Sequence, residues 1–105
     1  MILVTKLQED QLPLFFKLCS DHVSIEAIPR KALGLDLEGM KNKPIREHAV
    51  IMWTPHFVVL KNSNGQEITL RKDGRMVVRK ASNEQVARDA AIGVLSLVVK
   101  EFRRV

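Results

Sequence analysis

The sequence predicts an α+β fold, in which a curved antiparallel sheet of four to six strands carries a long C-terminal helix across one face. Met76 and Val78 alternate with Arg75, Val77 and Arg79 at the period of a half-buried strand, and apolar residues then recur at helical spacing over 87–102. Before this segment, several short strand-like runs are joined by connections too short for a parallel crossover. A helix of about 20 residues is roughly 30 Å long. Its apolar stripe can therefore cross a small sheet from edge to edge.

The first twenty residues are expected to add a strand or a helix to this domain. Residues 1–5 suit a short edge strand or an ordered arm. Asp10 can cap a helix over 11–19, in which Pro13 falls in the first turn, where its missing N–H has no intrahelical partner. We expect the apolar face of this helix to pack on the domain's own sheet. That face comprises Leu12, Phe15, Phe16 and Cys19.

The strands of the sheet are predicted by period and by turn residues. Segment 22–28 alternates apolar and polar residues and stops at Pro29, and 30–43 is irregular apart from a helical turn in LGLDLEGM. The apolar run AVIMW at 49–53 is typical of a strand that is buried on both faces or closes against a neighbour. Three more strands are expected over 57–61, 67–72 and 75–80, separated by the turn signals Asn-Ser-Asn-Gly and Lys-Asp-Gly.

The C-terminal helix is expected over 82–103. Ser82 can serve as its N-cap, because the hydroxyl can accept hydrogen bonds from backbone N–H groups of the first turn, and Glu84 places negative charge near the positive end of the helix dipole. The stripe that faces the sheet comprises Ala87, Ala90, Ala91, Val94, Val98 and Phe102.

Composition limits the class of protein. With 105 residues, of which 46% are hydrophobic, the chain is expected to form one domain over 1–105. The only cysteine, Cys19, can form neither an intramolecular disulfide nor a zinc cage, and no apolar run approaches the roughly 20 residues of a membrane span. We therefore expect an intracellular, cytoplasmic protein with no membrane association.

A candidate binding surface follows from the alternation of side chains along the strands. If the apolar residues of the last two strands face the long helix, the intervening residues face away from it. Together with the net charge of +5, this predicts a basic sheet face suited to phosphate and stacking contacts. The alternative is that the charges only keep an open sheet face soluble. The predicted binding residues are Phe57, Lys61, Thr69, Arg71, Arg75, Val77 and Arg79.

Three motifs, in order, resemble one repeat of the TATA-box-binding protein fold. They are AVIM at 49–52, GRMVV at 74–78 and ASNEQVARDAA at 81–91. LGLDLEGMKNKP at 33–44 is a shorter form of the family's L-D-L helix and the proline ahead of its second strand. The resemblance covers residues 23–102 and is gapless from Gly74 to Ala91, whereas the segment between Trp53 and Lys72 carries an insertion.

The resemblance implies a sheet face that presses into the DNA minor groove, which favours DNA over RNA as the partner without excluding RNA. That family has two repeats in one chain and this chain has room for one, so a comparable saddle requires a homodimer. The family wedges phenylalanines between base steps, but Glu47 and Arg71 stand at the corresponding positions here. The family's lysine after the glycine is kept in kind as Arg75, while Arg79 replaces a threonine. These departures favour phosphate contact over reading of base sequence.

The chain is not expected to be an enzyme. Its histidines, His22, His48 and His56, stand in three separate segments, and none has a partner at metal-ligand spacing. Cys19 is expected to be a buried, inert thiol. We therefore expect no catalytic residue, no metal and no cofactor. Two function classes remain: a nucleic-acid-binding module that uses the basic face, and a protein-interaction or assembly domain that binds no nucleic acid.

Overall fold

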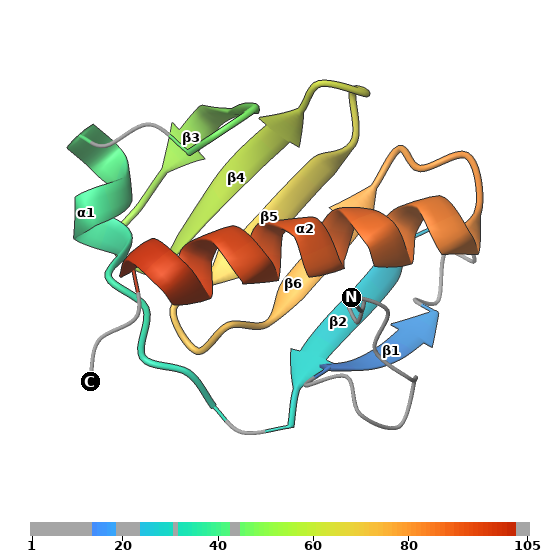
Figure 1. Ribbon diagram of the computed structural model, residues 1–105, viewed down its shortest axis with the longest axis horizontal. Helices are drawn as coiled ribbons and strands as arrows, with labels where there is room; N and C mark the ends of the chain where they lie inside the picture. Colours follow the sequence, from blue (N-terminus) through green and yellow to red (C-terminus); the bar gives the residue numbers. More distant parts are fainter. Residues whose placement is uncertain (1–13, 19–23, 31, 43–44, 103–105) are drawn as a thin grey trace, which may run out of the picture.

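A computed structural model describes residues 14–18, 24–30, 32–42 and 45–102 of the chain (Figure 1). Six antiparallel strands form one sheet in the order β1-β2-β6-β5-β4-β3, and the long helix α2 lies across it. This confirms the predicted fold class. The strands are β1 (Leu14–Leu18), β2 (Ile25–Pro29), β3 (His48–Trp53), β4 (Phe57–Asn62), β5 (Glu67–Arg71) and β6 (Met76–Arg79), and the helices are α1 (Leu37–Asn42) and α2 (Glu84–Phe102).

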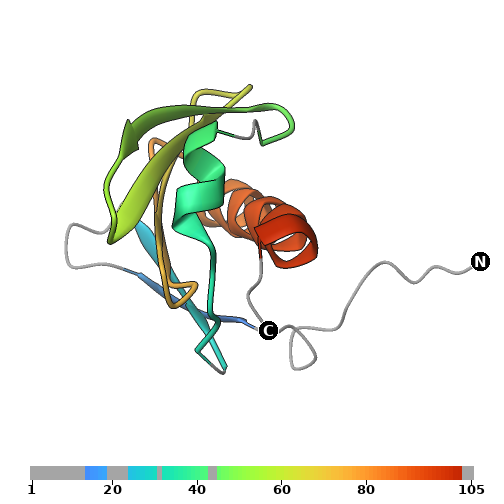
Figure 2. The ribbon, with the colours of Figure 1, turned by 90° about the vertical axis from the view of Figure 1, so that its left-hand side faces the viewer.

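The core lies between α2 and one face of the sheet. Alternate residues of the four inner strands point to this side, and Ala87, Ala91, Val94 and Val98 of α2 meet them. Figure 2 shows both helices on the same side of the sheet, with no helix on the other side among the described residues. The buried strand residues are Ile25 and Ala27 of β2, Met76 and Val78 of β6, Ile68 and Leu70 of β5, and Val58 and Leu60 of β4.

Two tight turns hold β4, β5 and β6 in register. Gly65 and Gly74 have φ angles of 87° and 95°, a region that glycine enters without the steric cost paid by other residues. Ile68 consequently lies opposite Leu60 on one side and opposite Val78 on the other. The apolar residues of the three strands therefore form continuous rows beneath α2.

The helix α2 begins two residues later than the sequence predicts. Asn83, rather than Ser82, caps it: the Asn83 side-chain oxygen Oδ1 accepts a hydrogen bond from the backbone N–H of Val86 at 2.9 Å. Both residue types are strong N-caps, so the local sequence does not choose between them. The predicted end at Arg103 lies outside the described residues.

The predicted first helix is wrong where the structure describes it, because Leu14–Leu18 is the edge strand β1, paired antiparallel with β2. Leu14 is buried and Phe16 is half-buried in this strand, whereas Phe15 is 51% exposed, so the predicted grouping of Phe15 and Phe16 on one apolar face is also wrong. Pairing with β2 outweighs the weak helix propensity of this short segment. The other residues of that prediction, and residues 1–5, lie outside the described residues.

The apolar run at 49–53 is an edge strand rather than a strand buried on both faces. It forms most of β3, which has β4 as its one neighbouring strand among the described residues, and α2 packs mainly against β2 and β6. Val50, Ile51 and Met52 are consequently 37%, 49% and 53% exposed. An apolar run does not show which of its faces are covered, so the alternative of a strand buried on both faces is wrong, whereas the strand itself and its closure against a neighbour, β4, are confirmed.

The short helix α1 covers the end of β3. The indole Nε1 of Trp53 donates a hydrogen bond to the backbone carbonyl of Leu37 at 2.7 Å, and the Lys41 ammonium lies 4.8 Å from the centre of the Trp53 ring. Asp36 accepts a hydrogen bond from the backbone N–H of Gly39 at 3.2 Å. The otherwise irregular segment before β3 is therefore fixed against the sheet.

We expect Val98→Asp to unfold the domain. Val98 is completely buried between α2 and the sheet. An unpaired carboxylate there should lower the free energy of unfolding by several kcal/mol, which is comparable with the total stability of a small domain, about 5–15 kcal/mol. Circular dichroism and thermal unfolding would measure this. Ser96→Asp, at an exposed position of the same helix, serves as the control. A cooperative, wild-type melting transition for Val98→Asp would show that α2 is not docked as described.

Two glycine substitutions should have opposite effects on stability. Gly93→Ala should raise the free energy of unfolding by roughly 0.5–1 kcal/mol, because Gly93 is inside α2 and an added Cβ meets no atom within 4 Å. Gly74→Ala should lower it, because φ is 95° and the added Cβ would lie 2.9 Å from side-chain carbons of Leu33 and Pro29. Urea unfolding of both variants would test this pair. Equal effects would contradict the described turn.

Candidate nucleic-acid interface

The sheet face opposite α2 carries all seven predicted binding residues. We define the open face as the side chains of β4, β5 and β6 that point away from the helix, together with Arg75, which directly precedes β6. Each alternates with a buried neighbour such as Val58, Leu70 or Val78, and is half-buried or exposed. The open face comprises Phe57, Val59, Lys61, Glu67, Thr69, Arg71, Arg75, Val77 and Arg79.

The strand register arranges the open face in three rows across the sheet. Val77, Thr69 and Val59 lie side by side in an uncharged middle row, which β3 extends with Met52. On one side of it, Arg71 lies opposite Phe57, and the backbone N–H of Arg71 donates to the carbonyl of Arg75 at 2.8 Å. On the other side, Arg79, Glu67 and Lys61 are neighbours. Cations therefore flank an uncharged strip on both sides.

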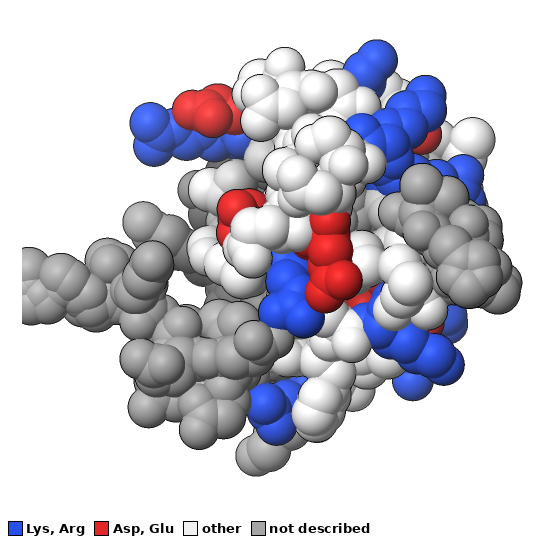
Figure 3. Space-filling model, turned by 90° about the vertical axis from the view of Figure 1, so that its right-hand side faces the viewer, with Lys and Arg blue, Asp and Glu red and all other residues white. Residues whose placement is uncertain are grey.

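The two cationic rows are separated by four residues along a strand, which corresponds to about 13 Å between their Cα atoms. In Figure 3, Lys and Arg side chains gather along the right-hand side of the view, the side on which the open face lies. Beyond β6 the middle row continues to Glu26 and Lys17, which lie opposite each other on β2 and β1. Charge there is balanced, so the cationic surface belongs to β4, β5 and β6.

Two carboxylates offset part of this positive charge. Glu67 lies 3.0 Å from the Lys80 ammonium, and Asp73 lies 3.9 Å from the Arg75 guanidinium. The hydrogen bond from Lys80 lowers the pKa of Glu67, with the charges of Lys80, Lys61 and Arg79 acting in the same direction against desolvation. Glu67 is therefore ionised at neutral pH.

The remaining cations of the open face form no direct ion pair, although Lys61 and Arg79 both lie next to Glu67. Arg71, Arg79 and Lys61 are exposed and make no salt bridge with any residue in the described parts of the chain. A charge without a protein counterion is available to an anionic ligand at little cost in broken contacts. These three residues are therefore the strongest candidates for phosphate contact.

A hollow of about 440 Å³ opens at one end of the open face, between the β3–β4 and β5–β6 turns. Sequence reasoning found three of its residues, Phe57, Thr69 and Arg71, but missed His56 and Lys72. These two lie at turns, where the alternation that places strand side chains no longer applies. The hollow is lined by His56, Phe57, Thr69, Arg71, Lys72 and Asp73.

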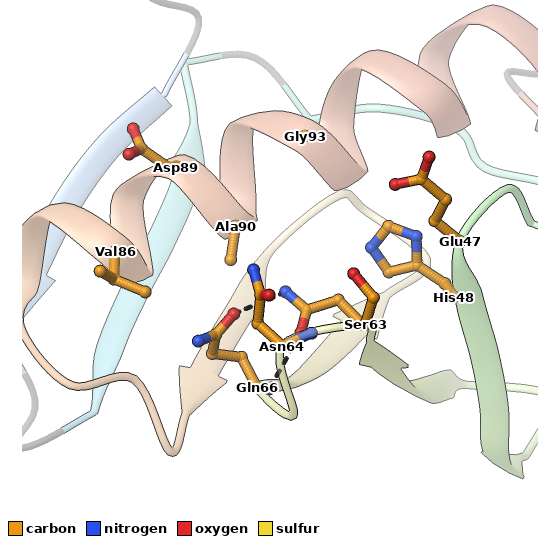
Figure 4. A pocket seen from close by; sticks show the side chains of 10 residues that line it. Glu47, His48, Ser63, Asn64, Gln66, Val86, Asp89, Ala90 and Gly93 are labelled. Carbon is orange, nitrogen blue, oxygen red and sulfur yellow. Dashed lines mark hydrogen bonds between the residues drawn. The ribbon is translucent and has the colours of Figure 1, made fainter.

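A second hollow, of about 300 Å³, lies between α2 and the β4–β5 turn (Figure 4). Its amide groups mainly stabilise the turn: Asn62 Oδ1 accepts hydrogen bonds from the backbone N–H groups of Asn64 and Gln66 at 3.1 and 2.9 Å. The Asn62 amide also donates to the Gln66 side-chain oxygen at 2.7 Å. The amide groups of this lining are thus explained by the turn itself.

In the part of the chain that the structure describes, no group of three or more His, Cys, Asp and Glu side chains is placed to hold a metal ion. Across the same residues, neither helix is both long enough and apolar enough to span a membrane. Cys19 and His22 lie outside the described residues. The chain matches no protein-family model, and no curated protein or solved structure is significantly similar to it.

Proposed function

We propose that this protein is a small nucleic-acid-binding module that uses the open face, mainly through contacts to backbone phosphates. The observation that carries the proposal is the uncharged strip of Val77, Thr69 and Val59 with cations on both sides. Phosphates bind to the arginines and Lys61, while sugars or bases cover the strip. Such contacts position a nucleic acid and carry little sequence information.

The resemblance to one repeat of the TATA-box-binding proteins supports this proposal and favours DNA over RNA. The described sheet and helix are compatible with that arrangement. One of the two family wedge positions, Glu47, lines the hollow beside α2 rather than the open face. The other, Arg71, is exposed on the open face. We therefore expect a module that neither kinks DNA with apolar wedges nor recognises a defined base sequence.

Binding should weaken steeply with salt, and the open-face arginines should account for the slope. Each phosphate contact releases about one condensed counterion, so replacing Arg71, Arg75 and Arg79 with alanine should reduce the slope of log K against log[salt] by about 1 per residue. All three side chains are exposed, so the triple variant should stay folded. Fluorescence anisotropy with random-sequence DNA at several salt concentrations would measure this, with circular dichroism to check folding.

A matched variant should act in the opposite direction. Glu67→Gln removes the one carboxylate within the cationic row of Arg79 and Lys61, and should therefore tighten binding. If the wild-type protein binds no nucleic acid at low salt, the proposal is wrong. If the triple variant binds as well as the wild type, another basic surface is used, such as the segment 30–43.

The second candidate function is assembly through the edge strand β3. Its outer backbone groups have no partner strand among the described residues, and no charged residue interrupts it from His48 to Trp53. Edge strands are usually protected by charge or by short length. A two-fold β3–β3 pairing would bring no like charges together and would join two open faces into one surface. We propose a homodimer of this kind.

Ile51→Lys should prevent this assembly without unfolding the protein. Ile51 is 49% exposed and lies at the bulge of β3, and a lysine on an edge strand opposes pairing with another edge. Sedimentation equilibrium should give a dimer for the wild type and a monomer for the variant. Gln85→Lys, at an exposed position of α2, controls for the added charge. A monomeric wild-type protein at high concentration would contradict the proposed dimer.

A further inference from the structure

We propose that the hollow between the β3–β4 and β5–β6 turns holds one unpaired nucleotide, so that the module binds single strands in preference to duplexes. This inference rests on the nucleic-acid-binding function proposed above and identifies the form of nucleic acid. The hollow, at about 440 Å³, falls within the range of small-ligand sites, roughly 300–1,000 Å³. It lies on the open face beside the uncharged strip, whose middle residue Thr69 is part of its lining.

The wall formed by the β3–β4 turn is fixed by its own hydrogen bonds. The backbone N–H of Phe57 donates to Thr54 Oγ1 at 2.9 Å, and the backbone N–H of Thr54 donates to the carbonyl of Phe57, also at 2.9 Å. The same Thr54 oxygen accepts from the backbone N–H of His56 at 3.1 Å. The two aromatic residues are therefore presented on a closed turn.

The opposite wall is equally fixed. In the β5–β6 turn, the backbone N–H of Gly74 donates to the carbonyl of Arg71 at 2.9 Å, and Asp73 Oδ1 accepts from the backbone N–H of Arg75 at 3.0 Å. A ligand between two such turns orders little of the protein when it binds. Preorganisation of this kind reduces the entropic cost of binding.

The chemistry of the lining matches the parts of a nucleotide. Phe57 and His56 offer ring surfaces for a base, and Arg71 and Lys72 offer cations for a phosphate. Phe57 and Arg71 are direct cross-strand neighbours, with Cβ atoms about 5 Å apart in such pairs. Asp73 repels a phosphate, which places the phosphate on the side of Arg71 and Lys72. A bare phosphate would not use the rings, and an apolar ligand would not use the cations.

A base can reach the Phe57 ring only when its own flat face is free. In a duplex that face is covered by the neighbouring base pairs, and exposing it requires unpairing and unstacking. Single strands present free base faces, and stacking on aromatic side chains beside a basic groove is a common way to bind them without sequence preference. Thr69 lines the hollow and also belongs to the uncharged strip. The strip therefore provides uncharged surface for the adjacent bases next to the hollow.

The test compares a fluorescein-labelled oligothymidine strand with the same strand in a duplex, by anisotropy at one moderate salt concentration. We expect the single strand to bind at least tenfold more tightly. Replacing its central nucleotides with abasic residues should weaken binding by about tenfold, the size of one lost stacking contact. This arm alters only the ligand, so protein folding cannot affect it.

Two protein variants test whether the base stacks on Phe57. Phe57→Leu keeps an apolar side chain but removes the ring, and should weaken single-strand binding by about tenfold and duplex binding by clearly less. Phe15→Leu is the matched control, because Phe15 is an exposed aromatic residue of the edge strand β1, far from the hollow in the strand order. The Arg30 guanidinium lies 4.4 Å from the centre of the Phe15 ring, over one of its faces. This control variant should bind like the wild type.

Each alternative result contradicts a different part of the proposal. Equal affinity for single strand and duplex, with no effect of abasic residues or of Phe57→Leu, would overturn this inference while the phosphate-binding function stands. No binding to either ligand at low salt would overturn both. If thymidine monophosphate displaces the strand at concentrations near the dissociation constant of the strand, the hollow takes a free nucleotide and the single-strand assignment is wrong.

Discussion

The packing of α2 against one face of the sheet is the constraint on which the rest of this structure depends. Burial of Val94 and Val98 against the strands fixes which side chains point inward. Because successive residues of a strand point to opposite sides, the same contact places Arg71 and Arg79 on the other face. The assignment of each strand residue to one face or the other therefore determines both the buried core and the candidate interface.

That register also explains why the open face is suited to a long anion. Three neighbouring strands contribute one uncharged residue each to the middle row, and the residues two positions away along each strand carry most of the charge. Glu67 offsets some of this positive charge by pairing with Lys80, while Arg71 makes no salt bridge within the described residues. The arrangement leaves Arg71 and Lys72 beside the hollow that Phe57 also lines, so this end of the face provides both a ring and cations.

Periodicity was sufficient to predict β2, β4, β5, β6 and α2, because each buries one side against a single partner layer. It failed for segments whose structure depends on which strand or helix lies beside them. Phe15 and Phe16 fit a helical face as well as a strand, and only pairing with β2 selects β1. The apolar run of β3 does not reveal that α2 packs mainly against β2 and β6. His56 and Lys72 were missed because turn residues follow no period, although the strands placed all seven predicted binding residues on one face.

The central claim is that nucleic acid is bound by the open face and not by the helical side. Amide chemical-shift mapping by NMR, during titration of the wild-type protein with a short oligothymidine strand, tests it most directly. We expect the largest shifts at Phe57, Thr69, Arg71 and Val77, with little change along the exposed side of α2. Shifts concentrated on α2 or on segment 30–43, with the open face unchanged, would contradict it.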